Sequence, residues 1–255
     1  MCGSTWKVVR KMRYFYDMHL HSCLSPCGDN DMTPYNLVNM AALSELDFIA
    51  LTDHNTCKNC PSAMKIAEKI GITLICGMEL CTAEEIHVVC LFPDLESAMA
   101  FDECIYPMIP DIPNKPHIFG EQLIMDTDDN IIDIEKKLLI TATNISITDV
   151  PKLVGRFGGV CYPAHIDKSS YSVLASLGSI PPECNFKAVE ISAKGDVAAL
   201  KSEHELLNRI PLILSSDAHY LEDINPRRAY LELDECTPSA VINALSGNCK
   251  GFGRG

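Results

Sequence analysis

The chain has 255 residues, of which 47% are hydrophobic and 22% charged, and its formal net charge is −13. This length is enough to bury a large core, and no apolar run approaches the ~20 residues that a transmembrane helix needs, so we expect no membrane partner. A protein that holds long nucleic acid usually presents a basic stripe, and the sequence shows none, so we do not expect a long nucleic acid as a partner.

Apolar runs alternate with amphipathic segments along the chain, which is the pattern of an α/β fold. The strands that we predict are 12–16, 48–51, 73–76, 86–92, 159–162, 188–191, 212–214 and 229–233. The helices that we predict are 34–44, 61–70, 95–105, 150–157, 197–209 and 238–245. Thr33 followed by Pro34 marks a helix start, and Gly71 and Gly158 stand where helices commonly end.

The alternation breaks between residues 93 and 148, where four prolines fall within 106–116 and an acidic stretch follows. We therefore predict a single barrel domain over 1–255, with a small insertion or cap at about 93–148. The last residues, 250–255, are predicted to form a disordered tail. The first residues, 1–16, lack the apolar stretch of a secretion signal, so we expect a cytoplasmic protein.

Thirteen cysteines are present, and many of them lie inside apolar runs. An odd number in such places indicates reduced, buried thiols rather than a disulfide framework. Cys23 and Cys27 follow the first predicted strand, and Cys57 and Cys60 follow the second. These four could form a separate metal or redox site, or they could remain unpaired thiols in neighbouring loops.

Six of the eight histidines stand in short motifs near strand ends, with Asp or Glu nearby. In chain order, the motifs are His19-Leu20-His21, Thr52-Asp53-His54, Gly77-Met78-Glu79 followed by His87, Pro163-Ala164-His165 and Ser216-Asp217-Ala218-His219. Neutral imidazole and carboxylate are typical ligands of divalent metals. Because the carboxyl ends of parallel barrel strands meet on one face, we expect a single metal site assembled by the fold.

The order and spacing of these motifs resemble the polymerase and histidinol phosphatase (PHP) family, from Asp17 to about Leu245. The resemblance implies a distorted seven-stranded (β/α)7 barrel of the TIM type that holds two or three Zn, Mn, Fe or Mg ions. A first metal would have four ligands: His19, His21, Glu79 and Asp217. A second would share Glu79 and add His87 and His165. A third would be held by His54, His219 and an aspartate from the loop after the first motif.

That loop departs from the family pattern, which has a short Asp-Gly turn before Thr-Pro. Here residues 25–34 read Ser-Pro-Cys-Gly-Asp-Asn-Asp-Met-Thr-Pro. Aligning backwards from Thr33-Pro34 places Asp29 at the ligand position. Asp31 is the alternative.

Such a site suits hydrolysis of a phosphate ester, because two metals ~3.5–4 Å apart lower the pKa of a shared water and clamp the phosphoryl oxygens. The catalytic residues that we predict are Glu79, Asp217 and Asp53, the last as a residue that orients a ligand histidine. Ligand histidines must be neutral, so metal occupancy should fall below about pH 6. Three cations could reach a substrate phosphate or remain solvated: Lys194, Arg227 and Arg228.

The function that we predict is hydrolysis of a phosphomonoester or nucleotide by a metal-activated hydroxide. Bound cations would offset the acidic charge locally, so the expected partner is a small phosphorylated substrate. Two alternatives remain open. One is a phosphodiesterase or short-oligonucleotide nuclease, and the other is a metal-binding regulatory module without catalysis.

Overall fold

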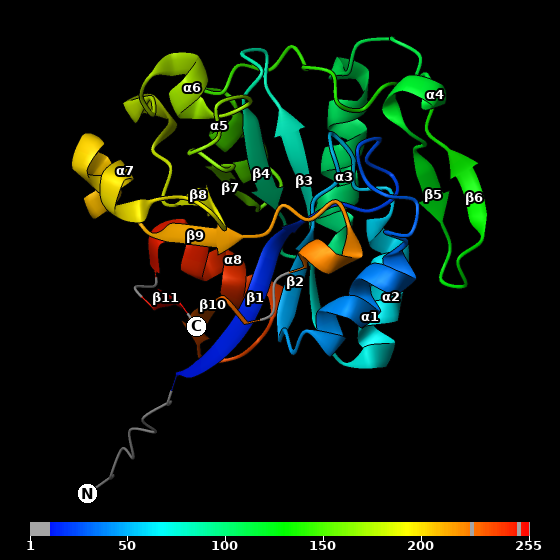
Figure 1. Ribbon diagram of the computed structural model, residues 1–255, viewed down its shortest axis with the longest axis horizontal. Coiled ribbons are helices and arrows are strands. Elements are labelled where there is room, and N and C mark those ends of the chain that lie inside the picture. The colour runs from blue at the N-terminus through cyan, green and yellow to red at the C-terminus, as the bar shows by residue number, and fades with distance from the viewer. Residues whose placement is uncertain (1–10, 225–226, 249–250, 255) are drawn as a thin grey trace, which may run out of the picture.

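Seven strands form one curled sheet at the centre of the molecule (Figure 1). The structure is a computed structural model that describes residues 11–224, 227–248 and 251–254. The strands follow the spatial order β11-β10-β1-β2-β3-β4-β7. Their bounds are β1 Met12–Leu20, β2 Phe48–Leu51, β3 Thr73–Cys81, β4 His87–Leu91, β7 Val160–Pro163, β10 Ala229–Leu233 and β11 Phe252–Arg254.

The strand directions in this sheet are mixed. Strands β1, β2 and β3 run parallel, whereas β4 runs antiparallel to both β3 and β7. A separate parallel pair, β8 (Val189–Ser192) and β9 (Leu212–Ser215), lies beside β1, where Leu20 and Ala218 form a bridge. The predicted α/β class and a curled sheet are therefore confirmed. A regular (β/α)7 barrel is not confirmed, because β3 and β4 form a hairpin with no helix between them.

Helices α1, α2 and α3 lie together on one side of the sheet (Figure 1). Thr33 caps α1 by accepting a hydrogen bond from the Asn36 N–H, and Gly71 ends α2 with a left-handed φ of 89°. No helix among the described residues is long and apolar enough to cross a bilayer. The helix bounds are α1 Pro34–Leu43, α2 Cys60–Ile70, α3 Leu95–Ile105, α4 Pro116–Phe119, α5 Val150–Gly155, α6 Val173–Leu177, α7 Val197–Glu203 and α8 Pro238–Asn243.

The main apolar core lies between these helices and the parallel strands. Every residue of β2 is buried, which explains its uninterrupted apolar sequence. Leu37 of α1 and Ile66 of α2 pack in the same cluster as Ile49 and Leu51 of β2. This packing holds the carboxyl ends of β1, β2 and β3 at fixed positions.

Two strands continue further than the sequence predicts. β1 runs to Leu20 and β3 to Cys81, so His19 and Glu79 lie inside strands rather than after them. The β1–β2 register shifts between Asp17 and Leu20. Such irregularities are common beside functional sites because they change the direction in which a side chain points. The predicted helix 197–209 is also shorter, since α7 ends at Glu203 and a 3₁₀ turn follows.

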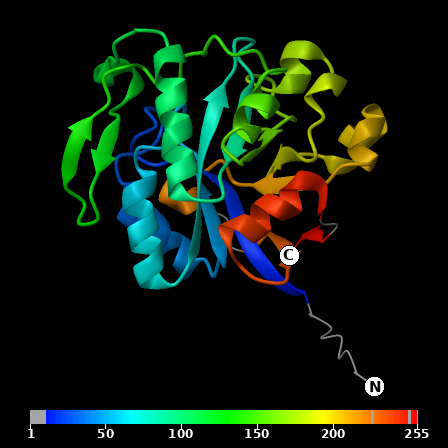
Figure 2. The same ribbon diagram turned by 180° about the vertical axis from the view of Figure 1, so that it is seen from behind.

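Part of the segment 93–148 stands apart from the central sheet. Its first helix, α3, packs against β3, but β5 (Leu123–Met125) and β6 (Ile131–Ile134) form a separate two-stranded sheet beyond α3 in both views (Figures 1 and 2). The tail predicted at 250–255 is wrong for residues 252–254, which pair with β10 as β11. Residues 250 and 255 lie outside the described part of the chain.

Candidate metal centre

Six histidines and two carboxylates meet in one cluster at the ends of the central strands. His19 lies in β1, Glu79 in β3 and His87 at the start of β4. The others stand just past β1, β2, β7 and β9, and they are His21, His54, His165, Asp217 and His219. Three sets have ligand atoms within 4.8 Å of one another: His21, His54 and His219; His19, His21, Glu79 and Asp217; and His54, Glu79 and His87. The fold therefore gathers every histidine that the motifs single out.

The Glu79 carboxylate lies at the middle of this cluster. One oxygen, Oε1, is 2.9 Å from His87 Nδ1 and 3.1 Å from Nε2 of both His19 and His165. The other, Oε2, is 2.9 Å from His54 Nδ1 and 3.3 Å from His21 Nε2. Burial alone would raise the pKa of Glu79, but the surrounding histidines hold it well below its ordinary value. The group is thus a carboxylate that faces two sets of imidazoles at once.

The donor set fits divalent metal ions. Buried carboxylate oxygens normally accept hydrogen bonds, yet neither Glu79 Oε2 nor Asp217 Oδ1 has a hydrogen-bond partner among the described residues. Imidazole nitrogens approach both oxygens, and these imidazole and carboxylate groups together are what borderline and hard cations bind. An ion among these atoms would supply the missing partner.

The ring of His19 is oriented by a residue that the motifs did not reveal. Its Nδ1 lies 2.9 Å from Oε1 of Glu190, a buried residue of β8. A carboxylate at that distance accepts the Nδ1–H, which leaves Nε2 as the atom that faces Glu79 and Asp217. Burial alone would lower the pKa of His19, but the carboxylates of Glu190, Glu79 and Asp217 raise it well above its ordinary value.

Asp53 binds two serines, one of which contacts a histidine of the cluster. Ser22 donates its N–H and its hydroxyl to the Asp53 carboxylate, and Ser25 donates its hydroxyl. The Ser25 oxygen must then accept from His21 Nδ1, 2.9 Å away, so the lone pair of His21 lies on Nε2. In the structure, Asp53 therefore orients a histidine through an intervening serine.

Asp217 and Lys168 form the exposed side of the centre. Lys168 Nζ pairs with Asp217 Oδ2, and 43% of the lysine side chain is exposed. Burial alone would raise the pKa of Asp217, but His19 and His21 hold it well below its ordinary value. Asp217 has a left-handed φ of 56°, and His165 a φ of 27°. Both conformations are costly for residues other than glycine.

The loop after β1 does not bring Asp29 into the cluster. The Asp29 carboxylate accepts the N–H of Asp31, and its own N–H donates to the His219 carbonyl oxygen. The residue that reaches the histidines is Cys27, whose Sγ is 3.2 Å from His54 Nε2. Cys27 as a whole is exposed, and the partial burial of its sulfur would raise the pKa of the thiol, but His54 and His219 lower it to about 5.

The four cysteines singled out by the sequence do not gather into one site. Cys27 lies beside His54, whereas Cys23 is buried near the carbonyl of Leu123. Cys57 and Cys60 are buried near Cys76, and burial raises the pKa of Cys57 well above its ordinary value. All eleven described cysteines are free thiols.

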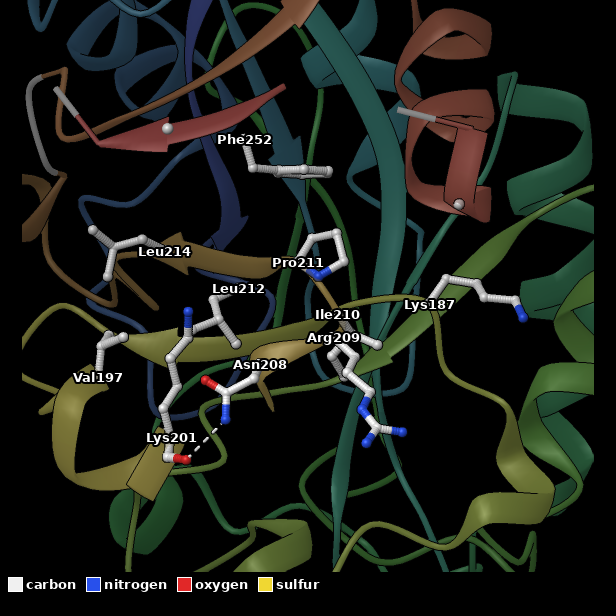
Figure 3. A pocket seen from close by; sticks show the side chains of 12 residues that line it. Lys187, Val197, Lys201, Asn208, Arg209, Ile210, Pro211, Leu212, Leu214 and Phe252 are labelled. Atoms are coloured by element: carbon white, nitrogen blue, oxygen red, sulfur yellow. Dashed lines mark hydrogen bonds between the residues drawn. The ribbon is translucent and has the colours of Figure 1, made fainter. Parts of the chain in front are cut away.

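The three cations predicted to meet a phosphate lie elsewhere. Arg227 pairs with Glu45 and stacks on Phe15, and both Arg228 and Lys194 are exposed. None of the three lines the cavity at the cluster, which has a volume of about 160 Å³. A larger cavity, of about 610 Å³, lies between β9 and β11 (Figure 3). Its lining residues include none of the clustered histidines or carboxylates.

Three functional positions were missed in the sequence, each for a different reason. Glu190 is an isolated acidic residue in the apolar run 188–191, and that burial signal could have identified it. Lys168 comes three residues after His165 and reaches Asp217 only through the fold. Tyr171 stacks on His87 at 4.8 Å although it is 47% exposed, and nothing in its neighbourhood marks it.

The PHP domain family matches this chain over residues 17–234. The chain belongs to the PHP domain family. A 5′-3′ exoribonuclease of Haemophilus influenzae is 38% identical over 77 residues, which are 29% of this chain and 27% of that protein. The lesion-specific endonuclease Q of Pyrococcus furiosus has a similar fold, with a TM-score of 0.66 at 18% identity, over 95% of this chain and 58% of that chain. The chain thus spans only part of each of these relatives.

One expectation about partners is wrong. A structure of endonuclease Q in complex with a 27-mer duplex substrate, with an abasic lesion at the active site, matches 92% of this chain with a TM-score of 0.64. From the net charge of −13 we had inferred that long nucleic acid is not a partner. The fold does not support that exclusion. That sum counts carboxylates that bound cations would neutralise, so it does not describe the electrostatic field at the centre.

Proposed function

We propose that this PHP domain hydrolyses phosphate esters of nucleotides or nucleic acids with the help of two or three divalent metal ions. The observation that carries the proposal is the Glu79 carboxylate, whose two oxygens face different sets of histidines. Ions held there would lower the pKa of a shared water and neutralise charge on the phosphoryl oxygens. Zn, Mn, Fe and Mg all remain candidates, since imidazole and carboxylate bind each of them.

Residues at the mouth of the centre support a phosphorylated substrate. Lys168 lines the 160 Å³ cavity, and the carboxylate of Asp217 raises its pKa against the effect of burial, so the ammonium stays charged. A charged ammonium there can contact a phosphoryl oxygen of a bound ester. The metal ligands would be those that the motifs predicted, apart from the aspartate of the loop after β1.

Tyr171 favours a substrate that carries a base. One face of its ring stacks on His87, with an angle of 24° between the planes, and the side chain also reaches solvent. An exposed aromatic ring beside a phosphate site can stack a nucleobase. The nucleases among the relatives agree with a diester substrate.

Hydrolysis of a phosphomonoester is the second candidate. The cavity of about 160 Å³ favours it, because a space of this size admits one phosphoryl group more readily than the middle of a duplex. The end of a nucleic-acid strand would fit both the small cavity and the exposed ring of Tyr171. Monoester and diester substrates must therefore be compared directly.

The test measures hydrolysis of paired aryl phosphate monoester and diester substrates by Mn-reconstituted protein. Asp217→Asn should lower turnover by more than about 100-fold, because loss of a group that only orients a ligand already costs about 10–100-fold. Glu68→Gln, an exposed change on α2, should leave turnover unchanged. Monoester turnover alone would select the second candidate. No turnover of either ester by protein with bound metal would favour a regulatory module.

A further inference from the structure

Cys27 stands beside His54, on the side of the imidazole ring that is turned away from Glu79. Its Sγ is 3.2 Å from His54 Nε2, while His54 Nδ1 faces Glu79 on the other side of the same ring. His54 also belongs to a set of imidazoles, with His21 and His219, whose ligand atoms lie within 4.8 Å of one another. The thiol therefore lies at the edge of a group that can already hold a cation.

The loop holds Cys27 at this place through its backbone. The Ser25 N–H donates to the Ser22 carbonyl, and the Gly28 N–H donates to the Ser25 carbonyl. A Cβ at Gly28 would lie only 2.6 Å from the Ser22 oxygen, so the turn after Cys27 requires glycine. The Asp29 N–H then ties the loop to the His219 carbonyl. Cys27 is thus fixed relative to both histidines.

The aspartates of the loop do not compete for this position. Oδ1 of Asp29 accepts the Asp31 N–H, and among the described residues neither aspartate carboxylate contacts His54 or His219, whereas the Cys27 sulfur contacts His54. Thiolate and imidazole are both zinc ligands, and zinc sites with three protein ligands keep a fourth position open for water or substrate. It binds hard ions such as Mg²⁺ and Mn²⁺ poorly.

We propose that Cys27 is a thiolate ligand of a divalent metal ion that is also bound by His54 and His219. The proposal rests on the metal centre of the proposed function but does not require hydrolysis. It makes this position selective for thiophilic ions such as Zn²⁺ and Co²⁺. The other sets, which contain only imidazole and carboxylate, have no such preference.

The experiment titrates the metal-free 255-residue chain with Co²⁺, because cobalt bound by thiolate has a charge-transfer absorption in the near ultraviolet. The wild type is compared with Cys27→Ser and Cys27→Asp. Cys104→Ser is the matched control, since Cys104 is a partly exposed thiol on α3. Bound metal is counted in each protein, and circular dichroism verifies that each variant is folded.

We expect the absorption in the wild type and in Cys104→Ser. Cys27→Ser should lose both the absorption and about one equivalent of bound cobalt. Cys27→Asp should bind that equivalent of cobalt again but without the absorption, because a carboxylate replaces the thiolate. An absorption that persists in folded Cys27→Ser, or one that never develops in metal-loaded wild type, would overturn the proposal. Ester turnover is measured separately, so a failure of the proposed function leaves this result interpretable.

Discussion

The histidine–carboxylate cluster and the cysteine group formed by Cys57, Cys60 and Cys76 lie near the same central strands, and both are buried. Both contain residue types that bind metals. In the cysteine group, the Cys57 thiol donates to the Gly77 carbonyl oxygen at 3.1 Å, and Cys60 lies 3.9 Å from that oxygen and from the Leu51 oxygen. In the other cluster, buried carboxylate oxygens lack such partners among the described residues.

The difference shows that residue type alone does not make a metal site. A buried thiol behaves as a small apolar group with a weak donor, so the backbone carbonyls and the core satisfy it. A buried carboxylate without a donor is unfavourable unless a cation completes its surroundings. The cluster also opens to solvent through the cavity beside Tyr171, whereas the cysteine group is enclosed.

Between these two regions, the largest effect that we expect on metal affinity concerns the support of the histidine cluster. Glu190→Gln removes the charge that orients His19, and such a loss typically lowers metal affinity by about 10–100-fold. Competition with a chelator measures the affinity. Glu183→Gln, an exposed change before β8, is the control. Equal affinity in the two variants would mean that His19 is oriented by other contacts.

The pH dependence should separate the metal-free from the metal-loaded protein. In the metal-free protein, burial would lower the pKa of His19 and of His54. The neighbouring carboxylates nevertheless raise the pKa of His19 above 6.5, and Cys27 and Glu79 do the same for His54. A group whose pKa rises on folding stabilises the fold below its unfolded pKa, and this contribution is lost as the pH rises through the folded pKa. The metal-free protein should therefore become less stable above about pH 6.5.

Metal-loaded protein should show the opposite trend, because protons compete with the ions for the same nitrogens. The sequence predicted that metal is lost below about pH 6, as for ordinary histidines. Because the pKa values of His19 and His54 are raised, protons should begin to compete at a higher pH. Thermal unfolding of both forms between about pH 6 and 8 measures the two slopes. Slopes of the same sign would show that the cluster does not couple metal binding to protonation.

The smallest effect is expected in the cysteine group. Cys60→Ala removes one buried sulfur from the core, and such a change should lower the free energy of unfolding by about 1 kcal/mol. The number of bound metal ions should stay the same. Denaturant unfolding and a metal count measure the two quantities. A loss of bound metal in Cys60→Ala would show that the cysteine group, like the histidine–carboxylate cluster, takes part in metal binding.

The sequence was sufficient to predict the α/β class, most strands and the convergence of the histidine motifs. Most of the motifs lie at or just past the carboxyl end of a strand, and His87 begins the antiparallel strand β4, so the directions of the strands determine where the ligands meet. The loop after β1 was harder, because the sequence offered only Asp29 or Asp31, whereas the turn that Gly28 permits brings Cys27 to His54. The contact of Glu190 with His19 joins residues 171 positions apart, and only the packing of β8 beside the cluster creates it.

The left-handed backbone at Asp217 has a consequence for how this protein can be altered by selection. Replacing this aspartate with glycine would relieve a conformational cost of about 1–3 kcal/mol and would also delete a carboxylate of the centre. Glycine would also remove the partner of Lys168 and a carboxylate that His19 and His21 stabilise. The backbone alone favours glycine at this single position, whereas these contacts and selection for activity retain the aspartate.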